Sequence, residues 1–187
     1  MTSPEEDVKF SSAERLLGAG LALILVALLI PSCVAYEGAR RERMVVRDMD
    51  RFIAAAERFF LEYGYWPSPH MGQPNDVRYG TTRSNQQVLN PLRAVAGPGN
   101  EGHELNPNRI VYLEVRPRRW GRSGLNDAGE WIDPWGMPYQ IVLDTDMNNV
   151  ATIADSIYAN QMDTGVVIWS YGRDRKRDTV QDILSWD

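Results

Sequence analysis

Two hydrophobic patterns follow one another in the first third of the chain. Leu16 to Tyr36 are 21 residues without a charged side chain, and they begin with the run LLGAGLALILVALLI. At about 1.5 Å per residue, a helix of this length reaches roughly 30 Å, the thickness of the hydrocarbon core of a bilayer. Residues 16–36 are therefore predicted to form a single membrane-spanning helix, preceded by a short cytoplasmic leader or N-terminal segment, residues 1–15.

An amphipathic pattern begins where the apolar run ends. Between residues 37 and 66, apolar side chains recur at steps of three and four, which is typical of one face of a helix. No Gly-Pro pair or polar linker separates the two patterns, so one continuous helix is predicted, ending at Gly64 before Pro67 and Pro69. The apolar face consists of Val45, Met49, Phe52, Ile53, Ala56, Phe59, Phe60 and Tyr63, and the face expected to meet water of Arg47, Asp48, Asp50, Arg51, Glu57 and Arg58.

The remaining chain changes character near residue 130. Residues 67–130 are rich in Gly, Pro, Asn and Arg and are expected to be mostly loop, with a short helix at Asn85–Ala96 and a strand at Arg109–Val115. Residues 131–187 contain PYQIVLD and VVIWSYG, which are typical of antiparallel strands, a DPWG turn, and a hairpin turn at DTDMNN. The predicted class is α+β, with the long helix packed on a small antiparallel sheet, whose core and edges include Trp131, Trp135, Trp169 and Trp186.

Composition narrows the possible functions. The 187 residues carry 20 basic and 25 acidic side chains, a formal charge of -5, so no nucleic-acid partner is expected. The chain has one cysteine, Cys33, which excludes an internal disulfide and a cysteine-based zinc site. No nucleophile elbow, phosphate-binding loop or metalloprotease signature occurs, and we expect no enzymatic activity and assign no catalytic or cofactor-binding residue.

The apolar segment allows three interpretations. A cleaved secretory signal would end at a small-residue site, whereas a charged segment with helical periodicity follows Tyr36. A lipoprotein signal would place the lipid on Cys33 within LIPSC. The third interpretation, a retained anchor that continues into the amphipathic helix, explains both hydrophobic patterns together.

Two stretches resemble type IV pilin-like proteins, specifically the major pseudopilin of type II secretion systems. Phe10, Glu14 and Pro31 match the first mature residue, the glutamate four positions later and the proline 21 residues after that phenylalanine. Near the C-terminus, DPWGMPYQIVLD, IWSYGRDRK and DILSW are similar to the turn, loop and final motifs of that family, and Trp66-Pro67 resembles its helix exit. The resemblance covers about two thirds of the chain, with residues 67–130 as an insertion.

The resemblance implies a function in assembly. It implies a structural subunit of a pseudopilus, anchored in the bacterial inner membrane by one helix, with its C-terminal domain in the periplasm and possible N-terminal methylation. Its partners would be further copies of itself, other pseudopilins and the secretion-system assembly platform. Glu14 would set the register of subunits by pairing with the amine freed at Phe10. The family also binds calcium in its C-terminal loop, which here corresponds to Asp174 and Asp182, with Asp178 between them.

Several features favour a different outcome. Lys9 stands where the leader peptidase of the family cuts after glycine, and the arginines that follow the span favour a cytoplasmic domain by the positive-inside tendency. An unprocessed or lipid-anchored protein that uses its pilin-like domain as a monomeric binding module is therefore the alternative.

Other features oppose metal or nucleic-acid binding. In the C-terminal loop, the three cations of RKR would repel a calcium ion, and a solvated loop closed by Arg-Asp pairs is the competing interpretation. DTDMNN lacks the glycine and the glutamate of a calcium loop. The basic clusters RPRRWGR and RDRKR are expected to be solvated.

Overall fold

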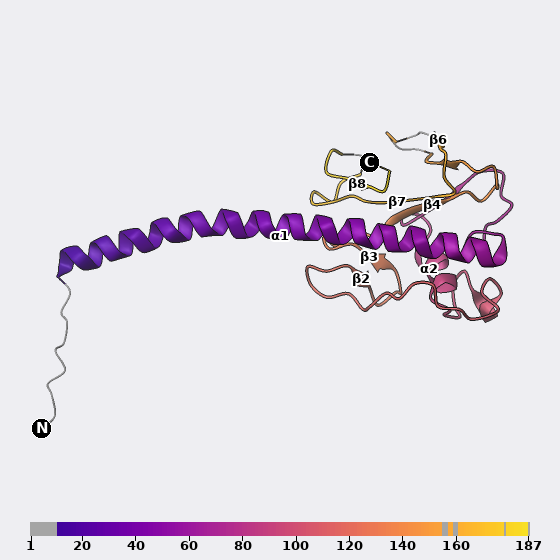
Figure 1. The fold of residues 1–187 in the computed structure, drawn as a ribbon, viewed down its shortest axis with the longest axis horizontal. Helices are drawn as coiled ribbons and strands as arrows, with labels where there is room; N and C mark the ends of the chain where they lie inside the picture. The colour runs from indigo at the N-terminus through magenta and orange to yellow at the C-terminus, as the bar shows by residue number, and fades with distance from the viewer. Residues whose placement is uncertain (1–10, 155–156, 159–160, 178, 187) are drawn as a thin grey trace, which may run out of the picture. The chain divides into compact units, whose positions relative to one another are not determined.

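The fold is that of a computed structural model, which describes residues 11–154, 157–158, 161–177 and 179–186. Within residues 11–30, side chains 14, 15, 22, 25, 26, 28 and 29 are outside that description. The chain divides into two units, Met1–Ala39 and Arg40–Asp187. A long N-terminal helix and antiparallel sheets make the class α+β, as predicted (Figure 1).

Helix α1 extends from Ser12 to Tyr63 and contains Pro31. One continuous helix was predicted for this part of the chain, and the assignment confirms it. Gly64 directly follows the helix, and its φ of 74° lies in the left-handed region that glycine adopts without strain. The N–H of Gly64 donates to the carbonyl of Phe60 at 2.7 Å. The predicted C-terminal cap is therefore confirmed.

The predicted membrane span is not tested by the described side chains. No helix among the residues that the structure describes is long and apolar enough to cross a membrane. The predicted segment, residues 16–36, includes five positions whose side chains lie outside the description, namely 22, 25, 26, 28 and 29. The span stays a prediction from the sequence.

The C-terminal half of α1 lies along the sheet (Figure 1), and its apolar side chains pack into a core shared with the strands. Val45, Met49, Phe52 and Phe59 are buried in one hydrophobic core together with residues of β4 (Gln140–Leu143) and β7 (Val166–Ser170). The predicted apolar face is thus confirmed. The prediction was wrong for one residue of the charged face: Asp48 was expected to meet water, but it is buried, with 8% of its surface exposed.

The main sheet has four antiparallel strands in the order β1-β4-β7-β8, where β1 is Val77–Tyr79 and β8 is Ile183–Leu184. Its register pairs Ile141 with Ile168 and Trp169 with Leu184. Because side chains alternate along a strand, β4 and β7 serve two cores. The core that contains α1 takes Ile141 and Ile168, and the core on the other face takes Val142 and Trp169.

Residues 67–130 contain the predicted short helix but not the predicted strand. Helix α2 is Gln86–Leu92, and it ends before Ala96 because Ala94 has a φ of 54°, outside the helical region. Arg109–Val115 forms no strand, so this prediction was wrong. The N–H groups of Tyr112 and Leu113 both donate to the carbonyl of Leu92, at 2.8 and 3.0 Å. The segment satisfies its backbone against a helix end instead of a neighbouring strand.

A 3-10 turn, η1 at Glu101–His103, and two small antiparallel sheets complete the described elements. Strand β2 (Gly124–Leu125) pairs with β3 (Trp131–Ile132), and β5 (Ala151–Thr152) pairs with β6 (Gln161–Met162). DTDMNN connects β4 to β5, which belong to different sheets, so it is a crossover loop and the predicted hairpin turn was wrong. Sequence alone does not decide which strands pair, because each short strand offers the same backbone groups.

The DPWG turn forms as predicted, and its aspartate is the reason. Asp133 is fully buried, and its Oδ1 accepts backbone N–H groups from Trp135, Gly136 and Met137 at 2.9, 2.7 and 2.8 Å. Its Oδ2 accepts the hydroxyl of Ser170 at 2.6 Å. One side chain thereby fixes the turn and attaches it to β7. The predicted tryptophan positions also hold, with Trp131, Trp135 and Trp169 buried and Trp186 half-buried against the second core.

Candidate functional site

A cavity of about 610 Å³ lies within the unit Arg40–Asp187, between α1 and the loop that follows Leu113. Positions 44, 47, 48 and 51 of α1 are three or four residues apart, so they share the helix face that forms one wall. Residues 114–124 form the other wall, and Trp131 of β3 closes it. The lining residues are Met44, Arg47, Asp48, Arg51, Glu114, Val115, Arg116, Pro117, Arg119, Arg122, Ser123, Gly124 and Trp131.

Backbone pairing holds the loop wall in place. The N–H of Arg118 donates to the carbonyl of Leu125 at 2.7 Å, and the N–H of Leu125 donates to the carbonyl of Arg116 at 2.9 Å. Gly124 is required at the crossing point, because a Cβ there would stand 2.6 Å from the Cα of Arg118. The arginine-rich loop is therefore folded back on β2 and presents its side chains from a fixed backbone.

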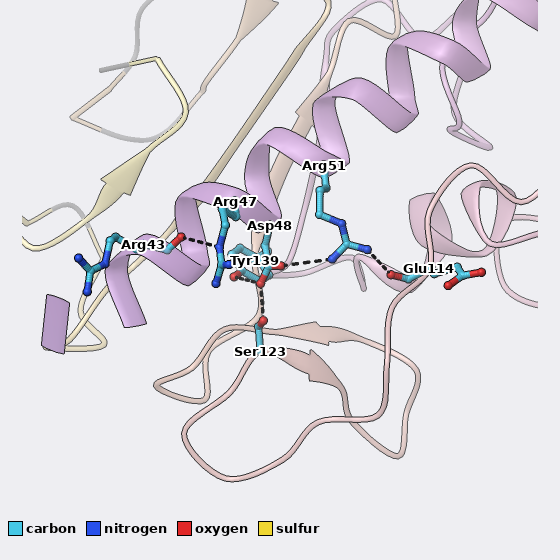
Figure 2. A network of polar contacts seen from close by, with 7 residues as sticks. All are labelled: Arg43, Arg47, Asp48, Arg51, Glu114, Ser123 and Tyr139. Carbon is cyan, nitrogen blue, oxygen red and sulfur yellow. Dashed lines mark hydrogen bonds and ion pairs between the residues drawn. The ribbon is translucent and has the colours of Figure 1, made fainter. Parts of the chain in front are cut away.

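Asp48 is the central polar residue of this site (Figure 2). Its Oδ2 accepts hydrogen bonds from the hydroxyl of Ser123 and, at 3.2 Å, from the hydroxyl of Tyr139. Its Oδ1 forms an ion pair with Arg51, with 3.7 Å between Oδ1 and Nη1. Arg51 also donates to the backbone carbonyl of Glu114 at 2.8 Å. The network therefore connects α1 to the loop and to Tyr139, which directly precedes β4.

Burial controls the titration of this network. Loss of solvent raises the pKa of Asp48 above its usual 3.8, and the hydrogen bonds from Ser123 and Tyr139 and the nearby Arg51 oppose the shift without cancelling it. The pKa of Tyr139 is raised well above 10.0, first by burial and then by the charges of Asp48 and Asp133. Tyr139 therefore remains a neutral hydrogen-bond donor at physiological pH, which is the form that Asp48 requires.

Further arginines of α1 lie close to Asp48 in the sequence and have contacts of their own. Arg47 donates to the backbone carbonyl of Arg43 at 3.3 Å, as Figure 2 shows. The guanidinium of Arg41 lies 5.8 Å from the centre of the Trp120 ring, a distance at which a cation attracts an aromatic face. The predicted solvated cluster RPRRWGR is indeed exposed, and the fold places it opposite the arginines of α1.

Sequence reasoning missed this site because it assigned Asp48 to the charged face of the helix. The available signal was spacing: Asp48 stands three residues after Val45 and four before Phe52, on the apolar face itself. Ser123 and Tyr139 are far away in the sequence, so no local pattern could connect them with Asp48.

Of the three residues predicted to direct assembly, the structure describes the side chain of Pro31 alone. Phe10 lies outside the described residues, as does the side chain of Glu14, and Pro31 is an exposed residue of α1. These three assignments stay predictions.

The predicted calcium loop is partly described. Thr179 donates its hydroxyl to Oδ2 of Asp174 at 2.9 Å and also lies 3.3 Å from Oδ1 of Asp182, so the fold brings these two aspartates together. Asp178 lies outside the described residues. The N–H of Lys176 donates to Oδ1 of Asp174 at 3.0 Å, which satisfies part of the carboxylate without a metal. Calcium binding here stays a prediction.

A second group of acidic residues includes two aspartates of DTDMNN, the segment that was predicted to be a hairpin turn. Asp144 and Asp146 of DTDMNN lie with Asp76 so that one carboxylate oxygen of each is within 4.8 Å of the others, a donor set that suits a hard cation. The backbone already supplies donors: Asp76 accepts N–H groups from Thr145 and Thr152 at 2.9 and 2.7 Å. Burial is the first cause that raises the pKa of Asp76 and of Asp144. The sequence could not find Asp76, which lies in a different loop.

Comparison with protein-family models, with curated proteins and with solved structures gives no match to this chain. The cavity combines guanidinium donors with a carboxylate that is already hydrogen-bonded internally, an arrangement suited to binding. The long helix, with its exposed apolar side chains, is suited to association.

Proposed function

We propose that this chain is a structural subunit of a type II secretion pseudopilus, which assembles through its N-terminal helix and contributes to moving proteins across the outer membrane. In this proposal, the first half of α1 anchors the subunit in the inner membrane and the C-terminal domain lies in the periplasm. The partners are further copies, other pseudopilins and the assembly platform. The resemblance of the N-terminal and C-terminal motifs supplies the family, and the helix supplies the physical support.

The observation that carries this proposal is the exposure of large apolar side chains on an uninterrupted helix. Leu16 and Leu17 are each 74% exposed, Leu23 is 71% exposed and Ile24 is 60% exposed. Apolar patches of this kind mark surfaces that are covered by lipid or by other protein chains. Neighbouring helices in a filament, and lipid before assembly, would both cover them. The same helix continues to Tyr63, where its other half is already covered by the sheet.

A second function is favoured by two specific features. Lys9 replaces the glycine after which the family is cut, and the C-terminal unit contains the arginine-lined cavity. An unprocessed or lipid-anchored protein that binds a ligand as a monomer would account for both. The two proposals differ in the covalent form of the N-terminus, which a single measurement distinguishes.

The test is intact mass spectrometry of the protein isolated from its native host. A chain that begins at Phe10, with or without a methyl group, supports the filament subunit. An intact Met1, or a chain that begins at a lipidated Cys33, contradicts it and supports the anchored binding module.

A substitution tests the proposed role of Glu14. In the filament proposal, Glu14→Ala abolishes recovery of sheared filaments while the protein still fractionates with membranes, because register-setting is lost and the apolar helix is kept. The matched control is Glu37→Ala, which removes a carboxylate beyond the predicted span and should leave filaments intact. Normal filaments from Glu14→Ala would refute the role.

A further inference from the structure

The cavity between α1 and residues 114–124 carries an excess of positive charge. Five of its lining residues are basic and two are acidic, Asp48 and Glu114. The whole chain carries a formal charge of -5, so this concentration of cations does not follow from the overall composition. Three of the cations belong to RPRRWGR, and the fold adds two from α1. All five basic residues are arginines: Arg47, Arg51, Arg116, Arg119 and Arg122.

Among these arginines, the acidic residues of the cavity form an ion pair with Arg51 alone in the part of the chain that the structure describes. Asp48 is occupied by Ser123, Tyr139 and Arg51. Glu114 is exposed, and its backbone carbonyl rather than its carboxylate receives Arg51. Three guanidinium groups of the loop are consequently left with unused donors.

These three groups belong to Arg116, Arg119 and Arg122. Across the described residues, their side chains form no hydrogen bond and no ion pair with protein groups. They extend from a backbone that is fixed by its pairing with Leu125 and by the close approach at Gly124. A fixed backbone lowers the entropy lost when such side chains close on a ligand.

The chemistry of the lining indicates the ligand class. Guanidinium groups present paired N–H donors that match phosphate oxygens, and several of them around one space favour a group with more than one negative charge. A volume of about 610 Å³ is within the range of ligand sites and larger than a single phosphate requires. We propose that this cavity binds a phosphate-class oxyanion with at least two negative charges, either as a free ion or ester or on a lipid headgroup.

The cavity lies entirely within the unit Arg40–Asp187, so its ligand does not depend on whether the N-terminus is processed. It would give the anchored binding module a ligand, and it would give a filament subunit a second, independent property. A failure to bind oxyanion therefore leaves the filament proposal untouched, and the mass of the N-terminus leaves the cavity untouched.

Calorimetric titration of the full chain with inorganic pyrophosphate tests the site. The protein is held in neutral detergent at pH 7, with ionic strength matched by sodium chloride. The double variant Arg119→Gln/Arg122→Gln should weaken binding about tenfold or more, the loss expected when charge-assisted hydrogen bonds are removed. The control Arg58→Gln/Arg173→Gln removes the same charge from exposed residues outside the cavity and should change binding less than about twofold.

Several outcomes would overturn the proposal. If the wild type shows no saturable binding of pyrophosphate, the cavity is not an oxyanion site. The same holds if the cavity variant and the control variant lose affinity for pyrophosphate equally. Tighter binding of a glutamate-rich peptide or of an oligonucleotide than of pyrophosphate replaces the ligand class. All four substituted arginines are exposed, so both double variants should keep the Tm of the wild type. An unchanged Tm shows that a loss of binding is not caused by unfolding.

The source of the oxyanion is identified by repeating the titration in nanodiscs. Discs of phosphatidylcholine are compared with discs that also contain phosphatidic acid. If a lipid headgroup is the natural occupant, phosphatidic acid competes and weakens the apparent affinity for pyrophosphate. Equal affinity in both discs supports a free ion or ester.

Discussion

Replacement of Asp133 by alanine should destabilise the C-terminal unit more than other single substitutions of a polar side chain in this loop. Its carboxylate accepts three backbone N–H groups of the DPWG turn on one oxygen and the hydroxyl of Ser170 on the other. The residue is fully buried, so water cannot replace the lost acceptor without a rearrangement of the turn. Asp133→Ala leaves three donors without a partner, because the N–H of Gly136 still donates to the backbone carbonyl of residue 133 at 3.1 Å.

The expected magnitude follows from those donors. An unsatisfied buried donor costs about 1–3 kcal/mol, so three give at least ~3 kcal/mol if the turn stays rigid. Partial opening of the turn to water lowers the sum, and an increase of about 3–5 kcal/mol in the free energy of the folded state is expected. Small domains are stable by about 5–15 kcal/mol in total, so the unit should approach its unfolding threshold.

Asp133→Asn separates the hydrogen bonds from the charge. Its amide oxygen still accepts the three N–H groups of the turn, while its NH₂ group faces Ser170 and requires that hydroxyl to accept. The serine oxygen already accepts the N–H of Gly172 at 3.0 Å, so this arrangement is crowded. A loss of about 1–2 kcal/mol is expected, clearly smaller than for alanine.

Urea unfolding of the full chain in neutral detergent, followed by tryptophan fluorescence, measures these differences. The matched control is Asp127→Ala, which removes an exposed carboxylate from the neighbouring loop and should change stability by less than about 0.5 kcal/mol. If Asp133→Ala unfolds within 1 kcal/mol of the wild type, about the span of ordinary mutational effects, then the turn is not held by this side chain.

Two further changes test the Asp48 network and the packing of the helix exit. Because burial raises the pKa of Asp48 above 3.8, the wild type gains stability as pH falls from 7 toward that pKa, and the gain is complete below 3.8. Asp48→Asn lacks this gain, so the variant should be less stable relative to the wild type at pH 4.5 than it is at pH 7. If the difference in unfolding free energy between the two proteins is the same at both pH values, the raised pKa of Asp48 is contradicted. Gly165→Ala should cost about 1–3 kcal/mol by overpacking, since its Cβ would stand 1.9 Å from Cζ2 of Trp66. Trp66→Leu should recover part of that loss in a double-mutant cycle. Gly38→Ala is the control without overpacking, because its Cβ meets no atom within 4 Å, and it should stabilise by up to about 1 kcal/mol since it lies inside α1.

Local patterns were sufficient for the elements that are defined by their own side chains. The three- and four-residue spacing from Val45 to Tyr63 predicted the buried face of α1, because a helix positions residues of that spacing on one side. Gly64 and the DPWG turn were also predictable, since glycine suits a left-handed cap and an aspartate before proline suits a turn.

Predictions failed where the partner of a segment decides its structure. Residues 109–115 have the composition of a strand, but the end of α2 accepts their N–H groups, and DTDMNN connects two sheets instead of closing a hairpin. Asp48 was assigned to water from its charge, although its position lies on the apolar face. In each case the competing contact lies far away in the sequence.

The sequence by itself determined the continuous helix, the α+β class, the turn at Asp133 and the apolar character of residues 16–36, because each depends on intrinsic conformational preference or on side-chain periodicity. Only the tertiary structure decided that arginines from two separate segments line one cavity around Asp48. The physical reason is that hydrophobic packing positions α1 on the sheet without regard to charge. The charged residues beside that packed face then lie wherever the loop 114–124 completes its own backbone hydrogen bonds.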